Sequence, residues 1–211
     1  MTAAVRSGSG YAPLVATRAL FFLCDVQERF RDVILGMDGL VATSQLLLGT
    51  ANALSIPTVV TEQYPKAMLH TMAELQPLIE GAPVFEKTKF SMVVPEVEAL
   101  LAGPAYVERT SAVLFGIEAH ICIQQTCLEL LGRGFSVHVV QDATSSQRCT
   151  DRSVALRRMQ AAGAHITTAE SIVFELIGDS RHPKFRQVSA LVKARVQNGG
   201  IGPDDAVATG Y

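Results

Sequence analysis

The sequence has little charge, no tryptophan and no long apolar run. Only 18% of its 211 residues are charged, and the formal net charge is −2. This balance argues against a protein that binds nucleic-acid phosphates, because such binding needs a concentrated Lys/Arg surface. Apolar residues make up 48% of the chain, so intrinsic disorder is not expected. We expect one compact, soluble domain that needs neither metals nor disulfides to fold.

The apolar runs are too short for a membrane helix. Such a helix needs about 18 apolar residues, whereas the longest run, Ala19 to Cys24, has the length of a strand. We therefore expect no membrane association. Residues 1–16 and 197–211 are expected to be terminal tails, the second because it is rich in Gly. One domain remains over residues 17–196.

The cysteines argue for free thiols. No two of them form a C-x-x-C pair, which excludes zinc-ribbon and thioredoxin-like sites. No secretion signal is visible, so free thiols in a reducing compartment are expected rather than disulfides, and we expect a cytoplasmic protein. The first 24 residues hold two arginines and no acid, a pattern also found in mitochondrial transit peptides, so mitochondrial targeting stays open. The cysteines are Cys24, Cys122, Cys127 and Cys149.

Short apolar runs alternate with helical patterns along the chain. Strands are expected within residues 18–25, 56–61, 112–116, 136–142 and 164–168. Helices are expected within residues 39–54, 121–131, 151–162 and 169–177. Apolar strands separated by amphipathic helices are typical of a parallel sheet covered on both faces. The sequence therefore predicts an α/β protein, a Rossmann-like three-layer α/β/α sandwich.

Ligands of open α/β sheets bind outside the carboxyl ends of the strands. Asp25, Glu62, the segment after Gly116 and Asp142 all follow expected strands. Asp25 has two interpretations: it caps the next helix, or it takes a proton from a nucleophile. Lys87 is either a solvated charge or a cation that stabilises a nearby thiolate and carboxylate.

Cys122 lies at a strand-to-helix junction. A thiol in the first turn of a helix is shifted toward thiolate by the helix dipole, although a free cysteine is often only a small core residue. Cys127, mid-helix, is expected in the core. Cys24 is expected in the core too, facing away from Asp25 because strand side chains alternate. Cys149 is expected in a polar loop.

The remaining basic side chains give weaker signals. No two histidines have metal-binding spacing. His138 and His165 alternate with apolar residues and are expected to be structural. A group of arginines is expected on a solvated helix face, with an RNA-binding patch as the alternative: Arg148, Arg152, Arg157 and Arg158.

Three segments, in this order, resemble the isochorismatase-like cysteine hydrolase family. Leu23 to Phe30 resembles the family's D-x-Q-x-x-F strand end, Lys87 to Ser91 its K-x-x-F-S segment, and Gly116 to Cys122 its nucleophile turn. Residues 61–65 and 182–185 resemble the eukaryotic isochorismatase domain-containing subgroup. The resemblance covers residues 18–196. It implies a six-stranded parallel sheet and a homo-oligomer, a dimer or tetramer.

The resemblance also implies a catalytic triad of Asp25, Lys87 and Cys122. Asp25 would accept the thiol proton, Lys87 would orient Asp25, and the thiolate would form a thioester that water resolves. The N–H of Cys122 and of a neighbour would form the oxyanion hole, beside a cis peptide expected at Ile117–Glu118. For Phe30 and Phe90 a core position is the alternative to pocket lining. The expected contacts to a small-molecule substrate are Gln27, Phe30, Tyr64, Phe90 and Glu118.

The departures from the family pattern bear on the substrate. Nicotinamidases of this family bind a metal through an Asp-x-His-type cluster after the second strand. Here that stretch is Thr61 to Pro65, and the nearest histidine is His70. We therefore expect no metal, no other cofactor and no nicotinamide substrate. Vinyl-ether hydrolysis needs an acid but no thiol, so Cys122 favours hydrolysis of an amide or related C–N bond.

The sequence thus predicts a metal-independent cysteine hydrolase that does not bind nucleic acid. Two alternatives from other classes stay open. One is a catalytically silent binding or scaffold protein that kept the fold. The other is a nucleic-acid-processing protein.

Overall fold

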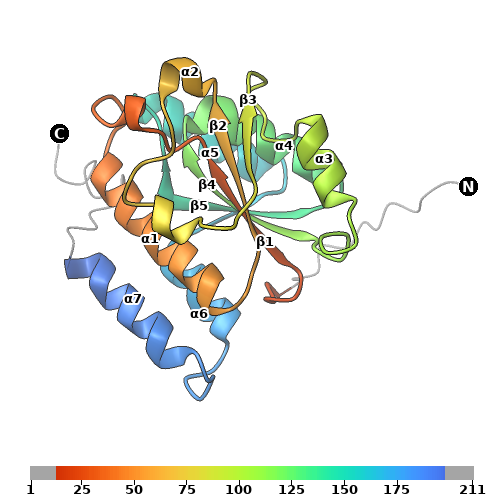
Figure 1. The fold of residues 1–211 in the computed structure, drawn as a ribbon, viewed down its shortest axis with the longest axis vertical. Helices are drawn as coiled ribbons and strands as arrows, with labels where there is room; N and C mark the ends of the chain where they lie inside the picture. The colour runs from red at the N-terminus through yellow and green to blue at the C-terminus, as the bar shows by residue number, and fades with distance from the viewer. Residues whose placement is uncertain (1–12, 198–211) are drawn as a thin grey trace, which may run out of the picture.

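The computed structural model describes residues 13–197, which fold around one six-stranded parallel sheet (Figure 1). The strand order is β3-β2-β1-β4-β5-β6. Neighbouring strands pair in parallel throughout. All five runs expected to be strands contribute one, and β3 is the sixth. The strands are β1 (Ala19–Cys24), β2 (Thr58–Gln63), β3 (Val84–Lys87), β4 (Ser111–Ile117), β5 (Ser136–Ser145) and β6 (His165–Thr167).

Helices cover both faces of the sheet, which confirms the three-layer α/β/α sandwich. One face carries α1 (Met37–Ala53), α6 (Ala169–Ile177) and α7 (Phe185–Gln197), which Figure 1 shows side by side. The other face carries α3 (Pro95–Leu101), α4 (Gln124–Gly132) and α5 (Cys149–Ala161). No helix within residues 13–197 is long and apolar enough to span a membrane. The shorter elements are η1 (Glu28–Phe30), α2 (Pro65–Met68), η2 (Gln76–Leu78) and the π-helix η3 (Ala119–Ile123).

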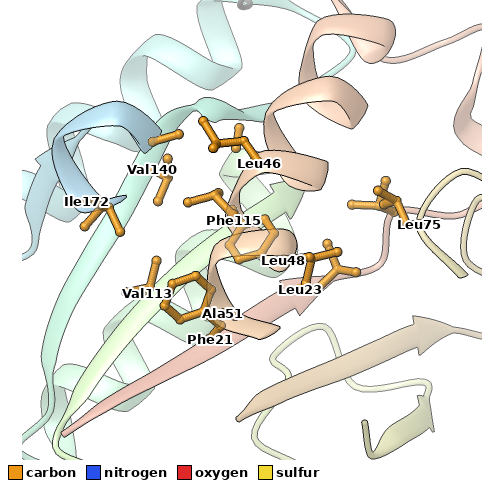
Figure 2. Close-up of a cluster of buried hydrophobic side chains, with 14 of the residues drawn as sticks. Phe21, Leu23, Leu46, Leu48, Ala51, Leu75, Val113, Phe115, Val140 and Ile172 are labelled. Atoms are coloured by element: carbon orange, nitrogen blue, oxygen red, sulfur yellow. The ribbon is translucent and has the colours of Figure 1, made fainter. Parts of the chain in front are cut away.

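The core forms because β1 is apolar on both faces. Phe21 and Leu23 pack toward α1 and α6, and Leu20 and Phe22 pack toward the helices of the other layer. Phe21 meets Phe115 edge to face, with ring centroids 6.2 Å apart (Figure 2). Burying each such side chain contributes roughly 1.5–3 kcal/mol. The central strands are therefore a rigid base for the residues that follow them.

The helix α7 was not predicted as a separate element. It packs on α1, where a Cβ at Gly49 would lie 3.0 Å from Leu191 Cδ1, so a small residue lets the two helices approach closely. Most of the expected tails, 1–16 and 197–211, lies outside the described residues. Leu14, at the end of the first, is buried, and its N–H donates to Glu175 Oε1 over 2.9 Å.

The strand order reverses between β1 and β4, which is the switch point of the sheet. From β1 the chain adds β2 and β3 on one side and later β4, β5 and β6 on the other. Ligands of open α/β sheets bind beside such a point, at the carboxyl ends of the strands. Asp25 follows β1 here, and η3 follows β4.

Candidate active site

Asp25 and Lys87 form a buried ion pair at the carboxyl edge of the sheet. Lys87 Nζ lies 2.6 Å from Asp25 Oδ2, and neither side chain is more than 1% exposed. Thr61 Oγ1 donates to the other carboxylate oxygen, Asp25 Oδ1, over 2.7 Å. The interpretation of Lys87 as a solvated charge is therefore wrong. Asp25 does not cap the next helix, because the residue at the N-cap of η1 is Gln27.

Lys87 is held by a shell of oxygen acceptors. Besides Asp25, its Nζ donates to Gln63 Oε1 over 2.6 Å and to the carbonyls of Lys89 and Phe90 over 3.2 and 3.0 Å. The K-x-x-F-S segment thus wraps around the ammonium of its own first residue. This shell replaces the water that burial removes.

The pKa of Lys87 reflects two opposing effects. Burial lowers it, but the negative charges of neighbouring groups and the hydrogen bond to Asp25 outweigh burial, so the pKa is raised above its usual value. Lys87 therefore keeps its charge inside the protein. The neighbours that act on it are Cys24, Asp25 and Cys122.

Cys122 lies in the π-helix η3, between β4 and α4. It is 6% exposed and lines a cavity. The turn before it is made by Glu118, which has left-handed backbone angles of φ 54° and ψ 65°. The cis peptide expected at Ile117–Glu118 is absent: that bond is trans, and the left-handed residue reverses the chain instead.

The main chain around Cys122 is largely committed to hydrogen bonds of the turn. The carbonyl of Glu118 accepts from the N–H of Ile121 over 2.9 Å and from that of Ile123 over 3.4 Å. Both sequence neighbours of Cys122 therefore use their N–H groups inside the turn. An oxyanion hole that uses the Cys122 N–H needs its second donor from elsewhere.

Cys24 is buried in the core, as predicted, but its side chain does not face away from Asp25. Its Sγ donates to Asp25 Oδ2 over 3.5 Å, and it also interacts with Cys122 through a hydrogen bond. Side-chain alternation fails here because Asp25 has a left-handed φ of 55°. Burial, followed by the hydrogen bond with Cys122, raises the pKa of the Cys24 thiol. The site therefore holds two thiols, of which sequence reasoning identified one.

The other two cysteines differ in exposure. Cys127 is buried in the core, as predicted, and burial raises its pKa to about 12. Cys149 is exposed and is the first residue of α5, so its expected loop position is wrong.

The cavity beside Cys122 has a volume of about 610 Å³. Phe30, Tyr64, Phe90 and Glu118, which were expected to contact substrate, are among the residues that line it. Tyr64 and Phe90 are about half exposed and lie at its rim, so Phe90 is not a core residue. Phe30 also packs against the core. The lining residues that were not predicted are Gln63, Met68, Thr88, Ile121 and Gln147.

Gln27 does not line this cavity, although it was expected to contact substrate. Its side chain is fully buried, and its Nε2 donates to the carbonyls of Gln63 and Leu69 over 3.1 and 2.6 Å. Its Oε1 accepts from the Gln63 N–H over 2.8 Å. Gln27 therefore fixes both ends of the segment that carries Tyr64 and Met68.

The segment after β2 is held by a hydrogen-bonded carboxylate. Glu62 is buried and accepts from the Thr71 N–H and Oγ1 over 2.7 and 2.8 Å. His70 Nδ1 lies 2.8 Å from its other oxygen, and this hydrogen bond raises the pKa of His70. No cluster of three or more His, Cys, Asp or Glu suited to a metal occurs within residues 13–197.

Two further residues singled out by sequence have structural environments. Asp142 pairs with Arg195 of α7 over 2.9 Å and accepts from the N–H of Ala169 at the start of α6. Arg152 is buried and donates to the carbonyl of Thr144 over 2.7 Å, so it does not belong to a solvated face. Neither residue lines the cavity.

Comparisons with known proteins identify the family of this chain. The Isochorismatase domain family model matches residues 19–171. Isochorismatase domain-containing protein 1 of Salmo salar is 48% identical, over 89% of this chain and 65% of that protein. The chain thus spans slightly less than two thirds of that relative's length.

Solved structures share the fold. MAR1 ribonuclease from Caenorhabditis elegans has a TM-score of 0.82 and 44% identity, covering 86% of this chain and 93% of that one. The Escherichia coli YcaC gene product, described as an octameric hydrolase of unknown specificity, has a TM-score of 0.78 and 22% identity, covering 96% and 97% of the two chains. The chain belongs to the isochorismatase family and groups with the isochorismatase domain-containing proteins of eukaryotes.

Proposed function

We propose that this protein is a metal-independent cysteine hydrolase that acts on a small amide or related C–N bond. Family membership supports a hydrolase-type function. The observation that carries the specific proposal is the buried Asp25–Lys87 pair beside the cavity that Cys122 lines. Lys87 also interacts electrostatically with Cys122, and this proximity of a thiol, a carboxylate and a fixed cation supports nucleophilic catalysis.

In the proposed reaction Asp25 accepts the proton of the Cys122 thiol. Sγ forms a bond to the carbonyl carbon, the C–N bond breaks, and the amine leaves with the proton from Asp25. Water then adds to the thioester, which releases a carboxylic acid and restores the thiol. Lys87 stays charged throughout, and its 2.6 Å contact with Asp25 fixes the direction of the carboxylate.

A silent scaffold protein is the first alternative. A protein that has lost catalysis would be expected to have separated triad side chains and a filled pocket. The Asp25–Lys87 distance of 2.6 Å and the cavity of about 610 Å³ instead support an enzyme.

A ribonuclease is the second alternative, because MAR1 ribonuclease is 44% identical to this chain. The arginines that would bind RNA are fewer than the sequence suggested, since Arg152 is buried. Arg148 is exposed but lies 3.8 Å from Asp151, which offsets its charge. Salt-sensitive binding of single-stranded RNA that is lost in an Arg148→Ala, Arg157→Ala and Arg158→Ala triple variant would support this function.

The proposed setting is a cytoplasmic homo-oligomer, a dimer or tetramer, with a small-molecule substrate. The YcaC octamer supports assembly as a property of this fold. Sedimentation velocity at micromolar concentration should give a mass above one chain of 22.6 kDa. A monomer would contradict this part of the proposal.

A hydrolysis screen tests the function. Wild type is incubated with a panel of small primary amides, ureido compounds and amino-acid amides, and released ammonia is measured with and without EDTA. We expect at least one substrate whose turnover is insensitive to EDTA, is abolished in Cys122→Ala and persists in Cys149→Ala. Turnover that survives in Cys122→Ala, or that EDTA abolishes, would overturn the proposal.

A further inference from the structure

Glu118 is the one carboxylate in the lining of the cavity. The other lining side chains are aromatic, aliphatic, amide or hydroxyl groups, together with the Cys122 thiol. Glu118 is only 6% exposed, and its left-handed backbone fixes it at the turn before the π-helix. A carboxylate is rarely buried unless a partner compensates its charge.

The hydrogen bonds of Glu118 are incomplete. Its Oε1 accepts from Gln147 Nε2 over 2.7 Å, whereas its buried Oε2 has no hydrogen-bond partner. Such an oxygen in a native structure calls for an explanation, because burial without a donor is unfavourable. Oε2 is shielded from solvent in this structure, so a donor on a bound ligand would satisfy it after the carboxylate rotates toward the cavity.

Among residues 13–197, no Lys, Arg or His lines the cavity with Glu118. The nearest such side chain is His120, whose Nδ1 lies 3.4 Å from Oε2, but Ser146 Oγ is closer to that nitrogen, at 3.1 Å. His120 Nε2 also faces a second carboxylate, Asp151, over 4.0 Å. Lys87 is committed to Asp25. Glu118 is therefore the one acidic group of the described cavity lining, beside an apolar wall and without a cation in that lining.

We propose that Glu118 selects the substrate by its charge. The favoured substrates carry a cationic or N–H donor group on an apolar or aromatic body, and compounds with a free carboxylate are rejected. The apolar body would lie against Phe30, Phe90 and Ile121, which line the same cavity. Two carboxylates placed close together repel each other, and the repulsion grows as less water separates them. This inference rests on the proposed function, because it takes the cavity beside Cys122 as the substrate site.

Charge-matched thiol reagents test the inference without a known substrate. Aminoethyl, methyl and sulfonatoethyl methanethiosulfonate are cationic, neutral and anionic. Each reacts with the Cys122 thiolate to form a mixed disulfide and release methanesulfinate. The rate constant for labelling Cys122 is measured by peptide mass spectrometry for wild type, Glu118→Gln and Glu80→Gln. Glu80 is exposed and precedes β3, so it lies near the amino ends of the strands, whereas the site lies at their carboxyl ends. Glu80→Gln therefore removes the same charge from the protein without changing the cavity.

We expect the ratio of cationic to anionic labelling rates to fall about tenfold in Glu118→Gln and to stay at the wild-type value in Glu80→Gln. The neutral reagent corrects for any change in thiol reactivity. An unchanged ratio in Glu118→Gln would overturn the proposal.

A second measurement uses only wild-type protein. Benzamidine, benzamide and benzoate are compared as protectants of Cys122 against the neutral reagent. The first two should protect at lower concentration than benzoate, and equal or better protection by benzoate would overturn the proposal. Neither measurement requires turnover. Charge selection at Cys122 without any amide hydrolysis would therefore count against the proposed function alone.

Discussion

Lys87 Nζ contacts Asp25 Oδ2 over 2.6 Å across 62 positions of sequence, and both side chains are excluded from solvent. Removing one partner of a buried ion pair leaves the other charge uncompensated. We therefore expect Lys87→Met to lower the free energy of unfolding by about 3–5 kcal/mol, measured by urea denaturation.

Two further variants test whether the loss of stability in Lys87→Met comes from the buried ion pair. Lys89→Met removes an ion pair with Glu129 whose lysine is half exposed, and should cost no more than about 1 kcal/mol. The double variant Asp25→Asn with Lys87→Met should be more stable than Lys87→Met alone. A Lys87→Met variant as stable as Lys89→Met would show that the buried pair is not formed.

Because β4 approaches β1 closely, there is no room for a side chain at Gly116. A Cβ at Gly116 would lie 2.1 Å from the carbonyl oxygen of Cys24, and the φ of Gly116 is 138°. Gly116→Ala should lower stability by at least about 3 kcal/mol, because main chain must move. Gly132, in α4, has open space at its Cβ, so Gly132→Ala should cause no loss and gain up to about 1 kcal/mol. Equal melting temperatures for the two variants would contradict this packing.

The four thiols should differ sharply in reactivity. With substoichiometric iodoacetamide at neutral pH, Cys122 should be alkylated first, although Cys149 is the exposed cysteine. Cys127, with its pKa raised to about 12 by burial, should react only after unfolding. Cys24, whose pKa is also raised, should behave in the same way. Peptide mass spectrometry of a time course gives the order, and an inert Cys122 beside labelled Cys149 would refute its activation.

His138 predicts a loss of stability in mild acid. It is buried against the ring of His165, and burial followed by the charge of His165 lowers its pKa from 6.5 to about 4. Between these values the unfolded chain binds a proton that the folded one does not, so stability falls as pH drops from 6.5 to 4. The loss from this residue is roughly 3 kcal/mol. Urea unfolding across this pH range should show a smaller loss of unfolding free energy for His138→Gln than for wild type. His182→Gln should show the same dependence of unfolding free energy on pH as wild type.

The layers of the fold were predictable because each depends on a repeated pattern. Runs such as Ala19 to Cys24 are apolar on both faces and have few alternatives to a central parallel strand. Residues 169–177 were expected as a helix and form α6 with the same bounds. The position of Asp25 at a strand end was also predictable, because it is the first charge after an apolar run.

The errors came from local backbone geometry that periodicity does not encode. The pairing of β5 with β4 shifts from Leu114–Val139 to Gly116–Thr144, which adds residues to β5 and moves its end to Ser145. Gln147, rather than Asp142, therefore follows the strand and lines the cavity. Likewise, the left-handed φ of Asp25 turns its carboxylate toward Cys24, whose side chain follows the alternation of β1 and lies in the same core layer as Cys122.

Trapping the acyl enzyme tests most directly whether Cys122 is the nucleophile. A substrate found in the hydrolysis screen is mixed with enzyme and quenched in acid within one turnover, and the peptides are analysed by mass spectrometry. We expect the acyl group on Cys122, removable by hydroxylamine and absent in Cys122→Ala, which should not turn over. Full turnover in Cys122→Ala, or an acyl group on another residue, would contradict the assignment of Cys122 as the nucleophile.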